Sequence, residues 1–348
     1  MENTITIGMD LGDQNHVVFV LDEKGIEIEM KTIRNTELSL RKFFSKYHNA
    51  TVAIEAGTHS PWISRLLSEI GCTVYVGNPR KLRLIWDSYD KSDQQDAKIL
   101  AMVCRVEPRL LWPIKHRDRK AYADLGVIKA RDALVKNRVR LVSHIRSVTK
   151  TCGYRIPKCS TDSFSKKAPE YIPNELKEPL EPLILTIEHL TQKIKDLNRQ
   201  IGKLCQKYPE TKRLLQVPGV GPVTALAFVL TIDDPHRFTK SRQLGAYLGL
   251  TPKRDQSGQC DKQLRISKAG NPYLRSLLIG CGHYIIGPFG PESDLRKYGT
   301  SIMARGGNSA KKRAAVAVAR KIAVLLHQLW ISEKAYDPFY KSAARCAA

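Results

Sequence analysis

Two short runs of alternating apolar residues, each ending in an acid, constrain the fold of this chain more than any other feature. One run ends at Asp10 and the other at Glu55. Alternation with a period of two is typical of a β-strand. Two further acids, Asp93 and Asp96, stand three residues apart in a segment with helical spacing, so both project from one side of a helix. Strand ends and one helix face can bring all four carboxylates to one point.

The pattern around these acids predicts an α/β domain. The elements should follow in the order strand–strand–strand–helix–strand–helix–strand–helix, with a hairpin over residues 4–22, a short strand at 31–34, a helix at 38–47, a strand at 51–56, a helix at 61–70, a strand at 72–76, and helices at 81–86 and 93–103. This is the order of a ribonuclease-H-like domain, in which acids gather at the centre of the sheet. Oxygen ligands gathered in this way are what Mg²⁺ or Mn²⁺ requires, which indicates metal-dependent phosphoryl transfer.

The distribution of charge indicates which phosphates the chain handles. The net charge is +23, but residues 1–116 hold 15 basic and 15 acidic residues, whereas Pro235 to the C-terminus holds 20 basic and 6 acidic ones. A neutral acid-bearing domain joined to basic segments suits an enzyme that grips and cuts a nucleic acid. No apolar run approaches 18 residues and the first residues do not resemble a secretory signal, so we expect a cytoplasmic protein without a membrane span. The eight cysteines form no C-x-x-C pair, which favours reduced thiols.

The rest of the chain reads as helical, and we expect three domains: a catalytic domain over residues 1–116, a helical region over 117–209 and a C-terminal domain over 210–348. A heptad pattern in the second region has Leu180, Ile187, Ile194 and Ile201 at its a positions and leucines at d. This pattern favours a two-stranded coiled coil. It fits either self-association or packing on the preceding helix within one chain.

The C-terminal region holds further candidate residues. Residues 215–222 resemble the hairpin of a helix-hairpin-helix module, in which Gly219 and Gly221 would bring backbone amides to a phosphate. Ser257 lies in a polar, glycine-flanked loop among basic residues, and such a serine could attack a phosphate. The expected nucleic-acid contacts are Arg80, Lys81, Arg83, Gly219, Gly221, Lys253, Arg254, Arg265, Lys268, Arg275, Lys311, Lys312 and Arg313.

Taken together, these motifs resemble the DEDD-type insertion-sequence transposases, the family of RNA-guided bridge recombinases. The resemblance covers nearly the whole chain and runs through residues 7–10, 53–56, 91–97, 218–222, 243–252, 256–258 and 266–271. It implies that Asp10, Glu55, Asp93 and Asp96 are the metal-binding tetrad of a RuvC-like domain and that Ser257 is the nucleophile of the C-terminal domain. The serine loop departs from many relatives, since residues 259–262 stand where those show Gly-Lys, and Ser267 is the rival serine.

The resemblance further implies donor and target DNA as substrates, a structured guide RNA as partner, and assembly as a dimer or, in the synaptic complex, a tetramer. Two other functions fit the same residues. A metal-dependent, structure-specific endonuclease of the junction-resolvase kind would use water as nucleophile and leave Ser257 idle. A nucleic-acid-binding scaffold would need no active site, but it gives no reason for acids at the ends of apolar strands, where an unpaired carboxylate is costly.

Overall fold

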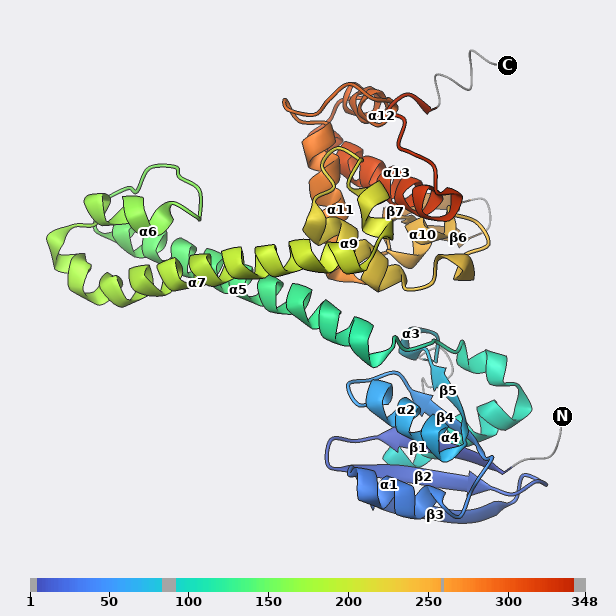
Figure 1. The fold of residues 1–348 in the computed structure, drawn as a ribbon. Coiled ribbons are helices and arrows are strands. Elements are labelled where there is room, and N and C mark those ends of the chain that lie inside the picture. The colour runs from blue at the N-terminus through green and yellow to red at the C-terminus, as the bar shows by residue number, and fades with distance from the viewer. Residues whose placement is uncertain (1–4, 83–91, 258–259, 341–348) are drawn as a thin grey trace, which may run out of the picture. The chain divides into compact units, whose positions relative to one another are not determined.

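The computed structural model describes residues 5–82, 92–257 and 260–340, and the chain separates into two compact units, Met1–Asp118 and Arg119–Ala348 (Figure 1). The first unit is α/β and the second is almost entirely helical apart from one β-hairpin.

The first unit is built on a five-stranded mixed sheet in the order β3-β2-β1-β4-β5. The strands β1 (Thr6–Leu11), β2 (Asn15–Leu21) and β3 (Glu27–Arg34) form an antiparallel meander, and β4 (Thr51–Glu55) and β5 (Thr73–Gly77) extend the sheet in parallel from β1. The helices are α1 (Glu37–Phe44), α2 (Ser60–Ile70), α3 (Pro79–Leu82) and α4 (Asp93–Val106), followed by the short helix η1 (Pro108–Leu111). This arrangement confirms the predicted ribonuclease-H-like α/β fold. Of the helix predicted at residues 81–86, residues 81–82 belong to α3 and the remainder lies outside the described residues.

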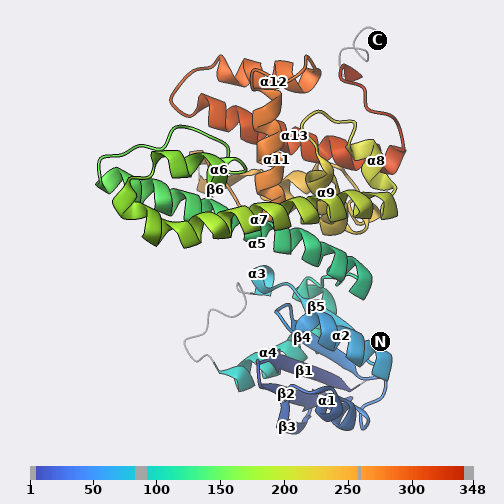
Figure 2. The same ribbon diagram turned by 60° about the vertical axis from the view of Figure 1, so that its left-hand side comes forward.

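Helices cover both faces of this sheet. On one face, Ile7 and Met9 of β1 share a buried cluster with side chains of α1 and α2. On the other face, Phe19 of β2 packs with Ala97 and Ala101 of α4. Figure 2 shows α4 on one side of the strands and α1 and α2 on the other. The alternation of the strands therefore divides their side chains between two separate layers of core.

The position of α4 depends on a glycine in the central strand. A Cβ atom at Gly8 would lie 2.0 Å from the carbonyl oxygen of Ala97 and 2.4 Å from the backbone nitrogen of Ala101. Only glycine permits this approach, so the backbone of α4 lies directly on β1. The first turn of α4, which carries two of the predicted acids, is thereby held against the sheet.

The second unit begins with a long antiparallel helical hairpin of α5 (Arg119–Thr151) and α7 (Asn174–Lys207), connected through α6 (Phe164–Lys167) and η2 (Ala168–Tyr171). The heptad isoleucines Ile187 and Ile201 are fully buried. Ile187 packs in one cluster with Ile145 of α5, and Ile201 packs in another with Ile128. The seam that the heptad pattern predicted is thus used within the chain, and the intramolecular hairpin is the alternative that the structure shows for it.

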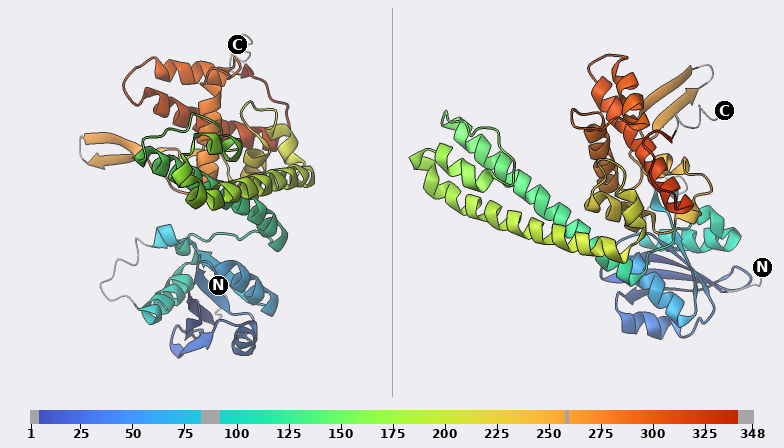
Figure 3. Two further views of the ribbon diagram at one scale, coloured as in Figure 1. Left: turned by 90° about the vertical axis from the view of Figure 1, so that its left-hand side faces the viewer. Right: turned by 45° about the horizontal axis from the view of Figure 1, so that its top comes forward.

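The remaining elements form a helical body with a projecting hairpin. They are α8 (Glu210–Leu214), α9 (Pro222–Ile232), η3 (Pro235–Arg237), α10 (Gln243–Tyr247), β6 (Pro252–Ser257), β7 (Cys260–Ile266), α11 (Pro272–Ile285), α12 (Asp294–Met303) and α13 (Ala310–Ser332). Figure 3 shows the β6–β7 hairpin projecting from these helices. By length and composition α13 could cross a membrane, but 56% of its apolar stretch is buried, mainly as core of this unit.

Candidate active site and nucleic-acid interface

Two of the predicted acids lie at the carboxyl ends of neighbouring parallel strands. The register pairs Met9 of β1 with Ile54 of β4, and the next residue of each strand is Asp10 or Glu55. Both acids are half-buried. The sequence places them there because each follows an apolar run that ends where the sheet ends, so the side chain meets the edge of the core.

The same two acids face α4. Asp10 lies two residues beyond Gly8, on which α4 rests. Glu55 lies two residues beyond Ala53, which packs with Leu100 of α4. Because strand side chains alternate between the faces, residues two apart share a face. Both carboxylates therefore point to the layer that α4 occupies.

The other two acids occupy the first turn of α4. Its N-cap is Ser92, whose hydroxyl accepts a hydrogen bond from the backbone N–H of Gln95 at 3.2 Å. This cap starts the helix directly before Asp93, which is exposed, while Asp96 one turn later is half-buried. Acids in a first turn also interact favourably with the helix dipole, so the local sequence stabilises this placement before any ligand binds.

The four carboxylates act on one another electrostatically. The pKa of Asp10 is raised to about 6, first by burial of the carboxyl group and then by the negative charges of the other three acids. A hydrogen bond from the backbone of Leu11 opposes this rise. The structure therefore brings all four predicted residues close enough for the charges of Asp93, Asp96 and Glu55 to act on Asp10.

This donor set fits a divalent cation by charge and by chemistry. A half-buried carboxyl group whose pKa is raised by neighbouring carboxylates, as that of Asp10 is, provides a negative site that a hard cation can neutralise. Within residues 5–82, 92–257 and 260–340, however, no three Asp, Glu, His or Cys side chains are arranged to hold one ion together. The four acids share a field in the structure without forming a closed ligand shell, and the tetrad as a ligand set stays a prediction.

A second group of polar residues beside these acids escaped the sequence analysis. The hydroxyl of Ser60 accepts from the backbone N–H of Gly57 at 3.0 Å and lies 2.9 Å from Nε2 of His116. The ring of His59 lies 3.1 Å from a carboxylate oxygen of Asp13. These contacts fasten the loop that follows Glu55. The signal in the sequence was a His-Ser pair soon after a strand that ends in an acid.

The structure changes the predicted setting of Ser257. This serine is the last residue of β6, where its backbone pairs with Cys260 of β7, so it ends a strand of a hairpin and does not lie in a loop. The rival Ser267 follows the hairpin, and its hydroxyl accepts a 3.4 Å hydrogen bond from the backbone N–H of Ala269. Ser257 belongs to the second unit and the four acids to the first.

The glycines of the predicted phosphate hairpin differ in their roles. Gly219 has a φ of +82°, and a Cβ there would lie 2.9 Å from the ring of Tyr284. Both the backbone conformation and the close neighbour therefore favour glycine at this position. Gly221 is the N-cap of α9 and has open space around it. A side chain would therefore clash at Gly219 but not at Gly221, and the phosphate contacts of both glycines stay a prediction.

The cationic residues that were predicted to contact nucleic acid differ in their surroundings. Arg80 is exposed, Lys81 lies over the ring of Trp112 at 4.7 Å, and Arg83 lies outside the described residues. Lys253, Arg254 and Lys311 are exposed, and Arg265, Lys268, Lys312 and Arg313 line one cavity of the second unit.

Arg275 corrects the prediction. It is only 9% exposed, and its guanidinium donates to the backbone carbonyls of Leu248 and Ala269 at 2.9 and 2.6 Å. An arginine bound in this way holds the chain segments around it together, and we withdraw it from the predicted phosphate contacts.

Comparison with known proteins agrees with this assembly of motifs. A DEDD transposase family model matches residues 7–152, which include the four acids, and the model described as "Transposase IS116/IS110/IS902 family" matches residues 211–298, which include Ser257. The chain is 27% identical to a "Probable family 20 transposase" of Pseudomonas aeruginosa, with 97% of this chain and 99% of that protein covered. It is 26% identical to the "Transposase for insertion sequence element IS1111A" of Coxiella burnetii, with 97% and 92% covered.

A shorter match is to a protein that bears a different name. The "Pilin gene-inverting protein" of Moraxella bovis is 28% identical over 156 residues, which is 43% of this chain and 47% of that protein. Both family models and the end-to-end relatives are transposases, and the chain belongs to the DEDD-type insertion-sequence transposases.

Proposed function

We propose that this transposase cuts and rejoins DNA through a covalent phosphoserine intermediate at Ser257, with Mg²⁺ or Mn²⁺ held by the acids of β1, β4 and α4. Cutting and rejoining of DNA comes with the family. The observation that carries the finer proposal is the raised pKa of Asp10. The ionised form of Asp10 is disfavoured by its burial and by the negative charges of Asp93, Asp96 and Glu55, and a bound cation would relieve both costs.

The covalent step conserves the phosphodiester bond energy. The Ser257 hydroxyl oxygen forms a bond to phosphorus as the bond to the DNA 3′ oxygen breaks, and the proton lost by the serine is balanced by protonation of the departing 3′ oxygen. The DNA 5′ phosphate is then an ester of Ser257. A 3′ hydroxyl from another strand can attack this ester and release the serine, so strands are exchanged without ATP.

The two parts of the chain would divide this chemistry. A serine hydroxyl is a poor nucleophile at neutral pH. A divalent ion, when bound, would polarise the phosphate and lower the pKa of the attacking hydroxyl. Asp10 and Glu55 would fix one side of its site from the sheet, and Asp93 and Asp96 the other from α4. The β-hairpin would present Ser257 at the end of a paired strand, which limits the movement of its backbone.

Guidance by a structured RNA and assembly into dimers or tetramers belong to the same proposal. The RNA rests on the family resemblance and on the net charge of +23, which suits a chain that binds more than one polyanion. Assembly would use surfaces other than the buried heptad seam of α7. The site of action would be the cytoplasm of the host cell. Sequencing the nucleic acid that co-purifies with the protein expressed beside its own flanking DNA tests the RNA directly.

A nicked DNA substrate tests the mechanism. Its nick lies shortly before the scissile phosphate, so the short segment released with the new 3′ hydroxyl diffuses away, cannot attack the ester, and leaves the adduct trapped. We expect a protein–DNA adduct that survives denaturing electrophoresis and that mass spectrometry places on the peptide containing Ser257. Ser257→Ala should lose the adduct and recombination but keep DNA binding, because the hydroxyl supplies the attacking oxygen and little affinity. Ser267→Ala serves as the matched control and should keep both.

The same assay distinguishes the resolvase-like alternative. If Ser257→Ala still cleaves DNA at the wild-type rate and no adduct forms, water is the nucleophile. An adduct on Ser267 would support the covalent mechanism and would identify Ser267, instead of Ser257, as the nucleophile. Asp10→Asn should lose the adduct too, whereas Glu37→Gln, an exposed acid of α1 that pairs only with a surface arginine, should not.

A further inference from the structure

A large cavity in the second unit carries a strong charge of one sign. It has a volume of about 1570 Å³ and is lined by residues of α12 and α13, by Arg242 just before α10, and by the base of the β-hairpin. Eight lysine and arginine side chains line it, and none of its described lining residues is an aspartate or glutamate. Its volume exceeds that of a site for one small ligand. The occupant should therefore be an extended polyanion.

The cavity is made chiefly by one face of α13, whose side chains alternate in character along the helix. Lys312 and Arg313 form a cationic pair, Val316 and Ala317 an apolar one, and Arg320 and Lys321 a second cationic pair. Val324 and Leu325 then repeat the apolar pair. Residues three and four apart share a helix face, so these pairs form bands across the cavity floor. The two cationic bands are eight residues apart, or about 12 Å along the axis.

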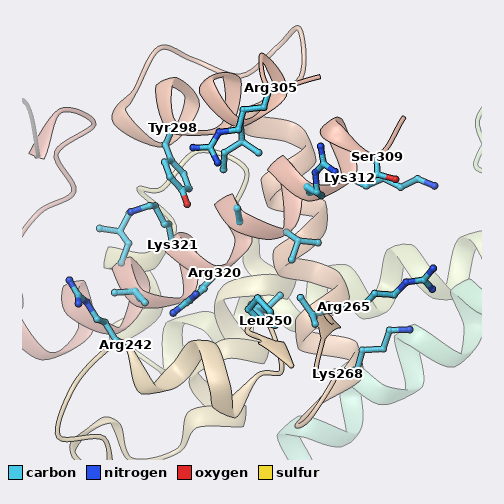
Figure 4. A pocket seen from close by; sticks show the side chains of 18 of the residues that line it. Arg242, Leu250, Arg265, Lys268, Tyr298, Arg305, Ser309, Lys312, Arg320 and Lys321 are labelled. Carbon is cyan, nitrogen blue, oxygen red and sulfur yellow. The ribbon is translucent and has the colours of Figure 1, made fainter. Parts of the chain in front are cut away.

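The opposite face of α13 is buried in the core, with Ala315, Ile322 and Leu326 fully covered. The helix therefore cannot rotate to hide its cationic bands, and these side chains are fixed toward the cavity. Figure 4 shows the labelled cations of α13 gathered with Arg242, Arg305 and Tyr298 around one space.

Several of these cations are positioned without an acidic partner. Arg242, Arg305, Lys312 and Arg320 form no ion pair with any residue that the structure describes. The side chain of Arg320 runs past Gly245, where an added Cβ would lie 3.0 Å from its Nε atom. Cations gathered without acids repel one another, and an anionic ligand relieves that repulsion.

One wall of the cavity comes from the β6–β7 hairpin, whose first strand, β6, ends at Ser257. Pro252 of β6 and Arg265 of β7 line it, and Pro252 is five residues before the serine, or about 17 Å along an extended strand. A strand bound in this cavity would thus lie next to the element that bears the proposed nucleophile.

We propose that this groove binds a single-stranded segment of nucleic acid, with phosphates on the cationic bands and bases against the apolar bands. A duplex presents phosphates but keeps its base faces stacked inside, so the apolar bands would gain nothing from it. Single strands expose their base faces, and grooves that combine cations with apolar or aromatic surfaces bind them. The inference rests on the proposed function only in taking nucleic acid as the polyanion, and it needs neither the metal nor Ser257.

The test measures binding of the full-length protein to labelled oligonucleotides by fluorescence anisotropy in EDTA, which prevents cleavage. The groove variant is Lys312→Gln with Arg320→Gln. The matched control is Lys203→Gln with Lys334→Gln, which removes the same charge from exposed residues outside the groove that are not among the predicted nucleic-acid contacts. We expect the groove variant to lose about tenfold in affinity for a single strand, and its salt slope to fall by about 1.4, or about 0.7 for each lost contact. The control should change neither value by a comparable amount.

Two further probes identify the occupant. A matched duplex should lose much less affinity than the single strand in the groove variant, and a strand of abasic nucleotides should bind wild type more weakly than the same strand with bases. Equal losses in the groove and control variants would show that only net charge matters and would overturn the groove. A duplex affected as strongly as the single strand, or an abasic strand bound as well, would overturn the single-stranded occupant.

Failure of this inference is separable from failure of the proposed function. Ser257→Ala should bind the single strand as wild type does while forming no adduct. If the groove variant binds normally and wild type still forms the serine adduct, the groove is not the strand site and the covalent mechanism stands.

Discussion

Asp10→Asn should stabilise the metal-free protein at neutral pH while abolishing its activity. The folded state raises the pKa of Asp10 from 3.8 to about 6, so it binds this proton more tightly than the unfolded chain does. The stability linked to this group is full below pH about 3.8 and is lost as pH rises through about 6. Above that pH the ionised carboxyl destabilises the first unit, and the neutral amide of nearly equal size removes this cost.

The magnitude follows from the pKa. A rise from 3.8 to about 6 corresponds to about 3 kcal/mol at full effect. Because the carboxyl is only half-buried, solvent screening reduces the expected gain to about 1–2 kcal/mol at pH 8. The gain should vanish at pH 4, where wild type carries the proton itself.

Urea unfolding followed by tryptophan fluorescence measures this gain in EDTA and in Mg²⁺. A Trp330→Phe background leaves the remaining tryptophans in the first unit, so the signal reports the unit that contains the acids. Mg²⁺ should stabilise wild type at pH 8 and should stabilise Asp10→Asn much less, because a ligand that binds only the folded state adds stability. Glu37→Gln is the control and should respond to Mg²⁺ as wild type does.

Two results would refute the reasoning. If Asp10→Asn is no more stable than wild type in EDTA at pH 8, then burial and the neighbouring carboxylates do not destabilise the ionised form of Asp10 as described. An equal response of both proteins to Mg²⁺ would mean that the cation binds elsewhere.

Three further predictions test the packing that positions the sites. Gly8→Ala should destabilise the first unit by about 1–3 kcal/mol and abolish cleavage, because its Cβ would lie 2.0 Å from the Ala97 carbonyl oxygen and displace α4. Gly57→Ala, in the same unit, adds a Cβ that meets nothing within 4 Å and should be neutral or slightly stabilising in the same urea assay. Ile194→Asp should open the α5–α7 hairpin, seen as faster hydrogen exchange along α7, without a change in mass by light scattering if the seam serves only the single chain. Arg275→Ala should lower the unfolding free energy by about 1–3 kcal/mol by leaving two carbonyls unpaired, yet leave the salt slope of DNA binding unchanged.

The local patterns of the first unit were sufficient to predict its elements. Alternation and helical spacing report which face of an element is apolar, and the strands that carry Asp10 and Glu55 near their carboxyl ends lie where those patterns put them. The convergence of the acids could be expected because parallel neighbours end at one edge. What the pattern could not supply was the close approach of α4 at Gly8, since that contact joins residues about ninety positions apart.

In the second unit the sequence left more open. The heptad isoleucines required a partner, and the pattern could not tell α5 of the same chain from a second copy. Ser257 was expected in a loop because its polar, glycine-flanked segment resembles one, but pairing with Cys260 makes it the end of a strand. The sequence does not show whether an arginine contacts phosphates or backbone carbonyls, and Arg275 contacts carbonyls.

By itself the sequence determined the four acids, the α/β order, the basic C-terminal half and the family resemblance, because strand and helix periods, charge and motif order are properties of neighbouring residues. The tertiary structure decided which neighbours raise the pKa of Asp10, which predicted cations face solvent, which face of α13 lines the cavity and which helix the heptad packs on. Those outcomes depend on contacts between segments that are far apart in the chain. Burial arises only from these contacts, and it affects both the pKa of a carboxyl group and whether a lysine or arginine side chain can reach a ligand.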